Sequence, residues 1–102
     1  MKTETVIAKM REYIQDFKEQ LAKDDIASVP ALTENSGTFF RELMGELPEG
    51  SALGRGVETF ASCVAVFGTA CRQADRKTAA RTLVEMEEVL SAVEREQGMV
   101  AH

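Results

Sequence analysis

The sequence lacks tryptophan, and its aromatic residues are limited to five phenylalanines and one tyrosine among 102 positions. A surface that stacks nucleic-acid bases needs several aromatic side chains, so this shortage argues against such a platform. Proline is also rare, with two residues, whereas charged residues make up 28% of the chain. Few helix-breaking residues among many helix-forming ones favour α helix over β sheet.

Cysteine and histidine are almost as scarce. Cys63 and Cys71 are too few for the disulfide framework of a small secreted domain, and the only histidine is His102. A zinc-type site would need further thiolate or imidazole ligands, so we expect neither a metal nor a cofactor. Eight residues of one helix separate two side chains by about 12 Å along its axis, which is beyond disulfide reach. We therefore interpret both thiols as core side chains.

The chain contains no run of 18 apolar residues, so we expect no contact with a membrane. The opening stretch MKTETVIAKMREY is charged throughout, unlike the apolar region of a secretion signal. These features predict a cytoplasmic protein. A length of 102 residues predicts a single domain, residues 1–102. The net charge of −5, from 12 basic and 17 acidic residues, disfavours general affinity for nucleic acid.

Apolar residues recur at helical spacing in four segments, approximately residues 3–23, 30–46, 52–72 and 76–97. The stripe of the first segment consists of Ile7, Met10, Ile14, Phe17 and Leu21. The stripe of the fourth consists of Ala79, Leu83, Met86, Leu90 and Val93. The third is apolar around more than half of its circumference, as expected for a central helix. The fold class predicted is all-α, a compact antiparallel bundle of three to four amphipathic helices.

Two breaks in this pattern stay open. Gly37 weakens the second segment by about 1 kcal/mol relative to alanine, so a break near Asn35–Gly37 is an alternative to one helix. Asp75 is the only turn signal between the third and fourth segments. We favour a break there with Asp75 as the N-cap, while a single long helix through residues 72–81 is the alternative.

The distribution of charge is the least expected feature. Arg72, Arg76, Lys77 and Arg81 stand against Asp75 alone, so this stretch carries +3 and the rest of the chain −8. Cations at the start of a helix oppose its dipole, each at a cost of a few tenths of a kcal/mol. Pairing with neighbouring helices explains such charges most simply. A partner-binding surface formed by the four basic residues is the sharpest functional hypothesis.

No catalytic constellation is present, so we predict a non-enzymatic protein that acts through protein–protein interaction, as a regulator, adaptor, chaperone or inhibitor. The strength of the apolar stripes favours a homodimer. An alternative is a small-ligand carrier or enzyme with an apolar pocket between helices. The residues proposed to line that pocket are Phe39, Phe60, Cys63, Phe67 and Met86. Nucleic-acid binding through residues 72–81 is a less favoured alternative.

Overall fold

The structure is a computed structural model, and it describes residues 3–23 and 29–98. Those residues form four α helices and no strand, which confirms the predicted all-α bundle. The helices are α1 (Thr3–Ala22), α2 (Val29–Glu46), α3 (Ala52–Arg72) and α4 (Arg76–Glu96). Each observed boundary lies within one residue of the boundary predicted from the sequence. Residues 24–28 of the predicted connection between the first two segments lie outside the described residues, as does His102, whereas Val29 begins α2 instead of ending that connection.

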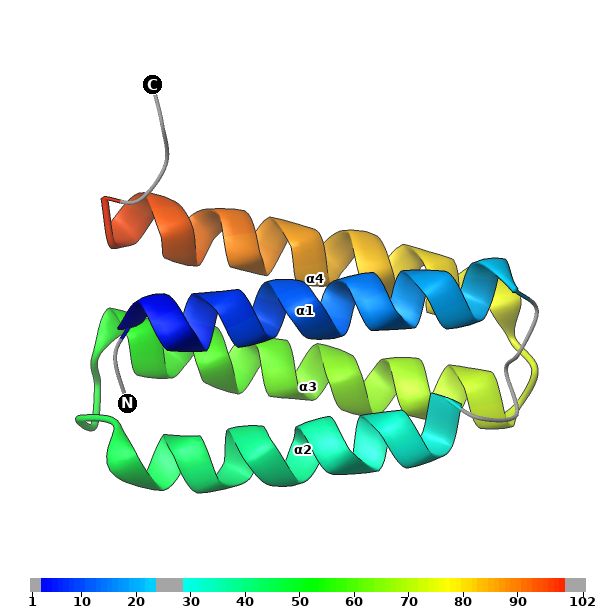
Figure 1. Cartoon of the computed structure of the whole chain (residues 1–102), viewed down its shortest axis with the longest axis horizontal. Coiled ribbons are helices and arrows are strands. Elements are labelled where there is room, and N and C mark those ends of the chain that lie inside the picture. Colours follow the sequence, from blue (N-terminus) through cyan, green and yellow to red (C-terminus); the bar gives the residue numbers. More distant parts are fainter. Residues whose placement is uncertain (1–2, 24–28, 99–102) are drawn as a thin grey trace.

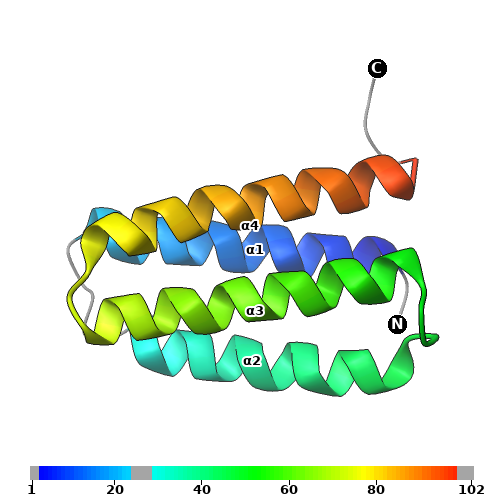
Figure 2. The ribbon, with the colours of Figure 1, turned by 180° about the vertical axis from the view of Figure 1, so that it is seen from behind.

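Three of the helices lie side by side in one layer, and the fourth covers one face of that layer. In Figure 1, α3 runs antiparallel to α2 on one side and to α4 on the other, and α1 lies in front of them. The most extensive helix contacts are those of α3 with α4 and with α2, as predicted for a central helix. Viewed from behind in Figure 2, α3 has no further helix lying over it. The molecule is correspondingly flat, with extents of 35 × 32 × 18 Å.

The turn between α3 and α4 is sharp, and Asp75 directs the chain into the new helix. Ala74 adopts a left-handed conformation, with φ of 56°. The Thr78 amide donates to Asp75 Oδ1 at 3.1 Å, and the Thr78 hydroxyl donates to Asp75 Oδ2 at 2.7 Å. Such bonds satisfy groups that the start of a helix otherwise leaves unpaired. The break at Asp75 is thus confirmed, and a single long helix through residues 72–81 is excluded.

The second open break is absent, because α2 continues through Gly37. The residues around Gly37 are held by packing on both sides, with Thr33, Ser36 and Phe40 buried. The buried Ser36 hydroxyl donates to the Thr33 carbonyl at 3.0 Å. Burial of this face of the helix outweighs a local cost of about 1 kcal/mol for glycine.

Phenylalanine rings form the centre of the core. Four of them, Phe17, Phe40, Phe60 and Phe67, have no exposed surface. The Phe17 and Phe67 ring centroids lie 4.9 Å apart, and those of Phe40 and Phe60 lie 5.0 Å apart. Tilted ring pairs at these separations are favourable beyond the area that they bury. These contacts join α1 to α3 and α2 to α3, so the few aromatic residues of the chain serve the core.

Two glycines of α3 allow its neighbours to approach closely. A Cβ atom on Gly68 would lie 2.8 Å from Thr33 Oγ1 on α2. A Cβ atom on Gly56 would overlap Val93 Cγ2 on α4. Both faces of α3 therefore use glycine where a neighbouring helix crosses.

Candidate protein-binding surface

The four candidate residues lie together at one end of the bundle. Arg72 ends α3 and Arg76 begins α4, and the turn between them brings these residues together with Lys77 and Arg81. All four side chains are exposed. We call this group, Arg72, Arg76, Lys77 and Arg81, the basic turn surface. The end of α3 and its turn into α4 lie on the right in Figure 1.

The electrostatic field of the basic turn surface acts on Asp75. The pKa of the Asp75 carboxyl is lowered, first by its hydrogen bonds from Thr78 and then by the positive charges of Arg81 and Lys77. Asp75 is also committed to capping α4, so its carboxylate is directed toward the helix amides. With Asp75 ionised and the four basic residues charged, the stretch of residues 72–81 carries a net charge of +3.

The helix ends at this turn also contribute to its positive charge. The first turn of α4 contains no acidic residue, and its free amide groups carry partial positive charge. Arg76 and Lys77 oppose this helix dipole, whereas Arg72 lies in the last turn of α3, where a cation is favourable. The predicted position of cations at the positive end of a helix is therefore confirmed for Arg76 and Lys77 but not for Arg72. A short stretch of chain keeps several positive charges together at a small cost in stability.

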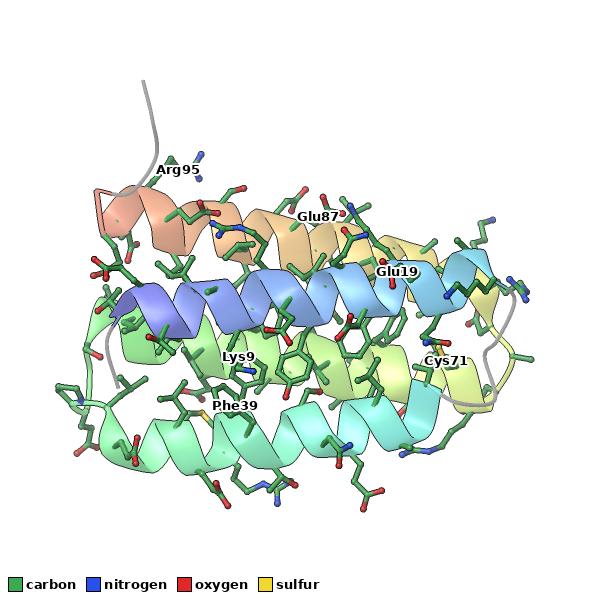
Figure 3. The ribbon with its side chains drawn as sticks, viewed as in Figure 1. Lys9, Glu19, Phe39, Cys71, Glu87 and Arg95 are labelled. Atoms are coloured by element: carbon green, nitrogen blue, oxygen red, sulfur yellow. The ribbon has the colours of Figure 1, made fainter. Side chains whose placement is uncertain are left out.

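The glutamates of α4 are used partly in pairing with α1. Glu94 accepts from Arg11 at 3.0 Å, and Glu87 lies 3.1 Å from Lys18 Nζ. Figure 3 labels Glu87 on α4 and shows Arg95 extending away from the bundle. Both ion pairs join α1 to α4 and neither involves the basic turn surface. Exposed pairs of this kind contribute little stability, but they account for part of the acidic face.

The two cysteines are core residues, as predicted. Cys63 and Cys71 are free and buried. Burial raises the pKa of both thiols, and the nearby negative charge of Glu85 raises the pKa of Cys63 further. Cys71 lies near the end of α3 that leads into the turn (Figure 3). A raised pKa keeps the thiol protonated at neutral pH, which is the opposite of what a nucleophilic or redox-active cysteine requires.

We expect a disulfide reagent to label the folded protein slowly at neutral pH, because neither thiol is exposed and both are protonated. Labelling should accelerate as the pH rises toward and above 9.0, the usual value from which both pKa values are raised. Denaturant should expose both thiols and abolish the slow labelling of the native cysteines. The control is a Val84→Cys variant, since Val84 is 54% exposed and should label rapidly. Rapid labelling of a native thiol at neutral pH would contradict this assignment.

The proposed apolar pocket is occupied by its own side chains. Phe60, Phe67 and Met86 have no exposed surface, and Cys63 is also buried. Phe39 extends from α2 toward α1, with its ring centroid 6.2 Å from that of Tyr13 (Figure 3).

Within residues 3–23 and 29–98, no three His, Cys, Asp or Glu side chains are grouped so that they could hold a metal ion.

The hollows that the structure describes lie on the surface instead. One of them, of about 620 Å³, is a groove between α2 and α3 with Arg41 and Arg72 among its lining residues. The sequence pointed to Arg72 but not to this groove, because periodicity does not show which faces of neighbouring helices remain apart.

No described helix is long and apolar enough to cross a membrane.

Comparison of the chain with protein-family models, with curated proteins and with solved structures gave no match.

Proposed function

We propose that this protein acts by binding another protein through the basic turn surface, as a regulator, adaptor, chaperone or inhibitor in the cytoplasm. The observation that carries the proposal is the exposure of all four basic side chains at one turn of an otherwise acidic protein. Such a surface complements an acidic segment of a partner and speeds the encounter of the two. The proposal also includes association of the protein with a second copy of itself.

Two structural features support a protein partner over the alternatives. Of the five residues considered for an apolar pocket, Phe60, Cys63, Phe67 and Met86 are buried in the core, and Phe39 is half-buried and packs against it. Four cations at one turn of a protein with net charge −5 form a small site, whereas nucleic-acid binding generally uses an extended basic surface. Neither feature depends on the identity of the partner.

Reversal of charge at Arg76 and Arg81 should remove most partner binding without harming the fold. Both side chains are exposed, and a glutamate in the first turn of α4 suits the helix dipole better than arginine does. We expect capture of the partner by Arg76→Glu/Arg81→Glu protein to fall about tenfold or more, while its melting temperature is retained.

The matched control reverses two charges elsewhere, with Lys9→Glu and Arg95→Glu. This variant has the same net charge as the test variant, and both altered residues lie away from the basic turn surface (Figure 3). Partner capture by the control should resemble that of the wild type. Equal loss in both variants would show that overall charge matters rather than this surface, and no loss in the test variant would overturn the proposal.

A further inference from the structure

The face of α3 that points away from α1 carries a regular stripe of exposed side chains. The stripe consists of Glu58, Ser62, Ala65, Thr69 and Arg72, all of them exposed. Their spacing alternates between four and three residues, which places them on one side of the helix. Phe67, which contacts Phe17 of α1, lies on the opposite side of α3, so the stripe belongs to the face of the layer that no helix covers in Figure 2. The spacing lets all five side chains face one neighbouring helix along its length, although their composition is polar rather than apolar.

The charges of the stripe are arranged symmetrically. Glu58 and Arg72 lie seven residues before and seven residues after Ala65, or about 10 Å on either side along the axis. Among the described residues, neither takes part in the three ion pairs, which join Lys9 to Glu12, Arg11 to Glu94 and Lys18 to Glu87. Two copies of α3 that cross antiparallel at Ala65 would therefore bring each Glu58 to the other copy's Arg72.

The middle of the stripe suits close contact between helices. Ala65, Ser62 and Thr69 are small, and both hydroxyls are already bonded within α3. Ser62 Oγ donates to the Glu58 carbonyl at 3.2 Å, and Thr69 Oγ1 donates to the Ala65 carbonyl at 3.1 Å. Burial of these hydroxyls would leave no donor without a partner, so the usual penalty for burying a polar side chain is avoided.

A second pair of charges on α2 shares nearly the same centre. The close approach of Gly68 to Thr33 fixes the register of the two antiparallel helices, so Gly37 lies about level with Val64. Glu34 and Arg41 lie three residues before and four residues after Gly37, and all three line the α2–α3 groove. A two-fold axis through Ala65 thus places Glu34 of each copy toward the other copy's Arg41. Complementary charges on both helices select the antiparallel orientation.

We propose that a second copy of this chain docks on the uncovered face, with the two α3 helices antiparallel and crossing at Ala65. Each copy presents the same surface, as a two-fold dimer requires. The inference rests on the self-association included in the proposed function and specifies its face and its register. Arg72 belongs both to this interface and to the basic turn surface, whereas Arg76, Lys77 and Arg81 lie beyond the interface and stay accessible to a different partner.

The first test is a charge exchange followed by light scattering across a concentration series. Glu58→Arg alone and Arg72→Glu alone should each weaken the dimer by about tenfold or more, because like charges then meet twice in the interface. The double variant Glu58→Arg/Arg72→Glu should restore the wild-type dimer, since both ion pairs reform with reversed polarity. A monomeric wild type, or a double variant as weak as the single ones, would overturn the proposal.

The second test is a disulfide across the two-fold axis. Ala65→Cys protein should form a covalent dimer on mild oxidation, because the two new thiols meet at the crossing point. Val84→Cys is the matched control, exposed on α4, and should stay uncrosslinked. A failure of Ala65→Cys to crosslink would also overturn the proposal.

The proposals for the two surfaces can be refuted separately. If the protein stays monomeric while charge reversal at Arg76 and Arg81 abolishes partner capture, only the dimer is refuted. If the dimer forms through α3 while that reversal changes nothing, only binding through the basic turn surface is refuted.

Discussion

Replacement of Phe60 by alanine is expected to lower the free energy of unfolding by about 3–5 kcal/mol. The Phe60 ring has no exposed surface and packs against Phe40 with its centroid 5.0 Å away. Removal of the ring loses its burial and leaves a cavity at the contact of α2 with α3, which the rigid helices cannot close. A domain of this size has a total stability of about 5–10 kcal/mol, so the variant should be close to its unfolding limit at room temperature.

Chemical denaturation of wild type and variant, monitored by circular dichroism, measures this loss directly. Val84→Ala is the control, because Val84 is 54% exposed and its truncation should change stability by no more than about 0.5 kcal/mol. Should the variant at Phe60 be destabilised by no more than this control, the aromatic centre of the core would be refuted.

Alanine at Gly56 should lower the free energy of unfolding by about 1–3 kcal/mol, although alanine is the better helix former. The added methyl group would overlap Val93 Cγ2, so either the stiff Val93 side chain must leave its rotamer or α3 and α4 must move apart along their most extensive contact. The same substitution at Gly68 should also destabilise the protein, since its Cβ would lie 2.8 Å from Thr33 Oγ1 and 3.3 Å from Thr33 Cβ.

The matched controls are Gly37→Ala and Gly45→Ala. Both glycines lie inside α2, and an added Cβ would have no atom within 4 Å. At these two positions only helix propensity changes, so each control substitution should raise the free energy of unfolding by about 0.5–1 kcal/mol. The test is whether the change in the free energy of unfolding has opposite signs in the two groups of variants. Chemical denaturation of all four variants measures it. A gain at Gly56 would mean that the close approach of α3 and α4 is absent.

The sequence predicted the helices well because each carries a strong apolar stripe. All five stripe residues predicted for the fourth segment are buried in α4, and Asp75 caps that helix as expected. The basic turn surface was also predictable, because its four residues are close in sequence and the turn at Asp75 keeps them together.

Features that depend on the relative register of helices were not predictable. Gly37 weakens an isolated helix, yet α2 continues through it because a buried face holds its backbone. The contact of Gly56 with Val93 depends on how far α4 slides along α3, which no local pattern specifies. The uncovered side of α3 emerges only when α1 is seen to occupy the opposite face of the layer (Figure 2).

The structure separates the residues that maintain the fold from those available for binding. Four phenylalanine rings and the thiols of Cys63 and Cys71 are enclosed in the core. Four basic residues lie at the turn before α4, and the open face of α3 carries one acidic and one basic residue on either side of small side chains. In this account, binding depends on two neighbouring surfaces, one for a different protein and one for a second copy of the chain.

The most direct test of the proposed function is quantitative capture of partners from the native host at low and at raised salt. Wild type, Arg76→Glu/Arg81→Glu and Lys9→Glu/Arg95→Glu proteins are compared by mass spectrometry. We expect a partner that is captured by wild type and control, that binds more weakly at raised salt because exposed charges are screened, and that the test variant does not capture. Equal capture of every partner by the test variant and the wild type would contradict the proposed function.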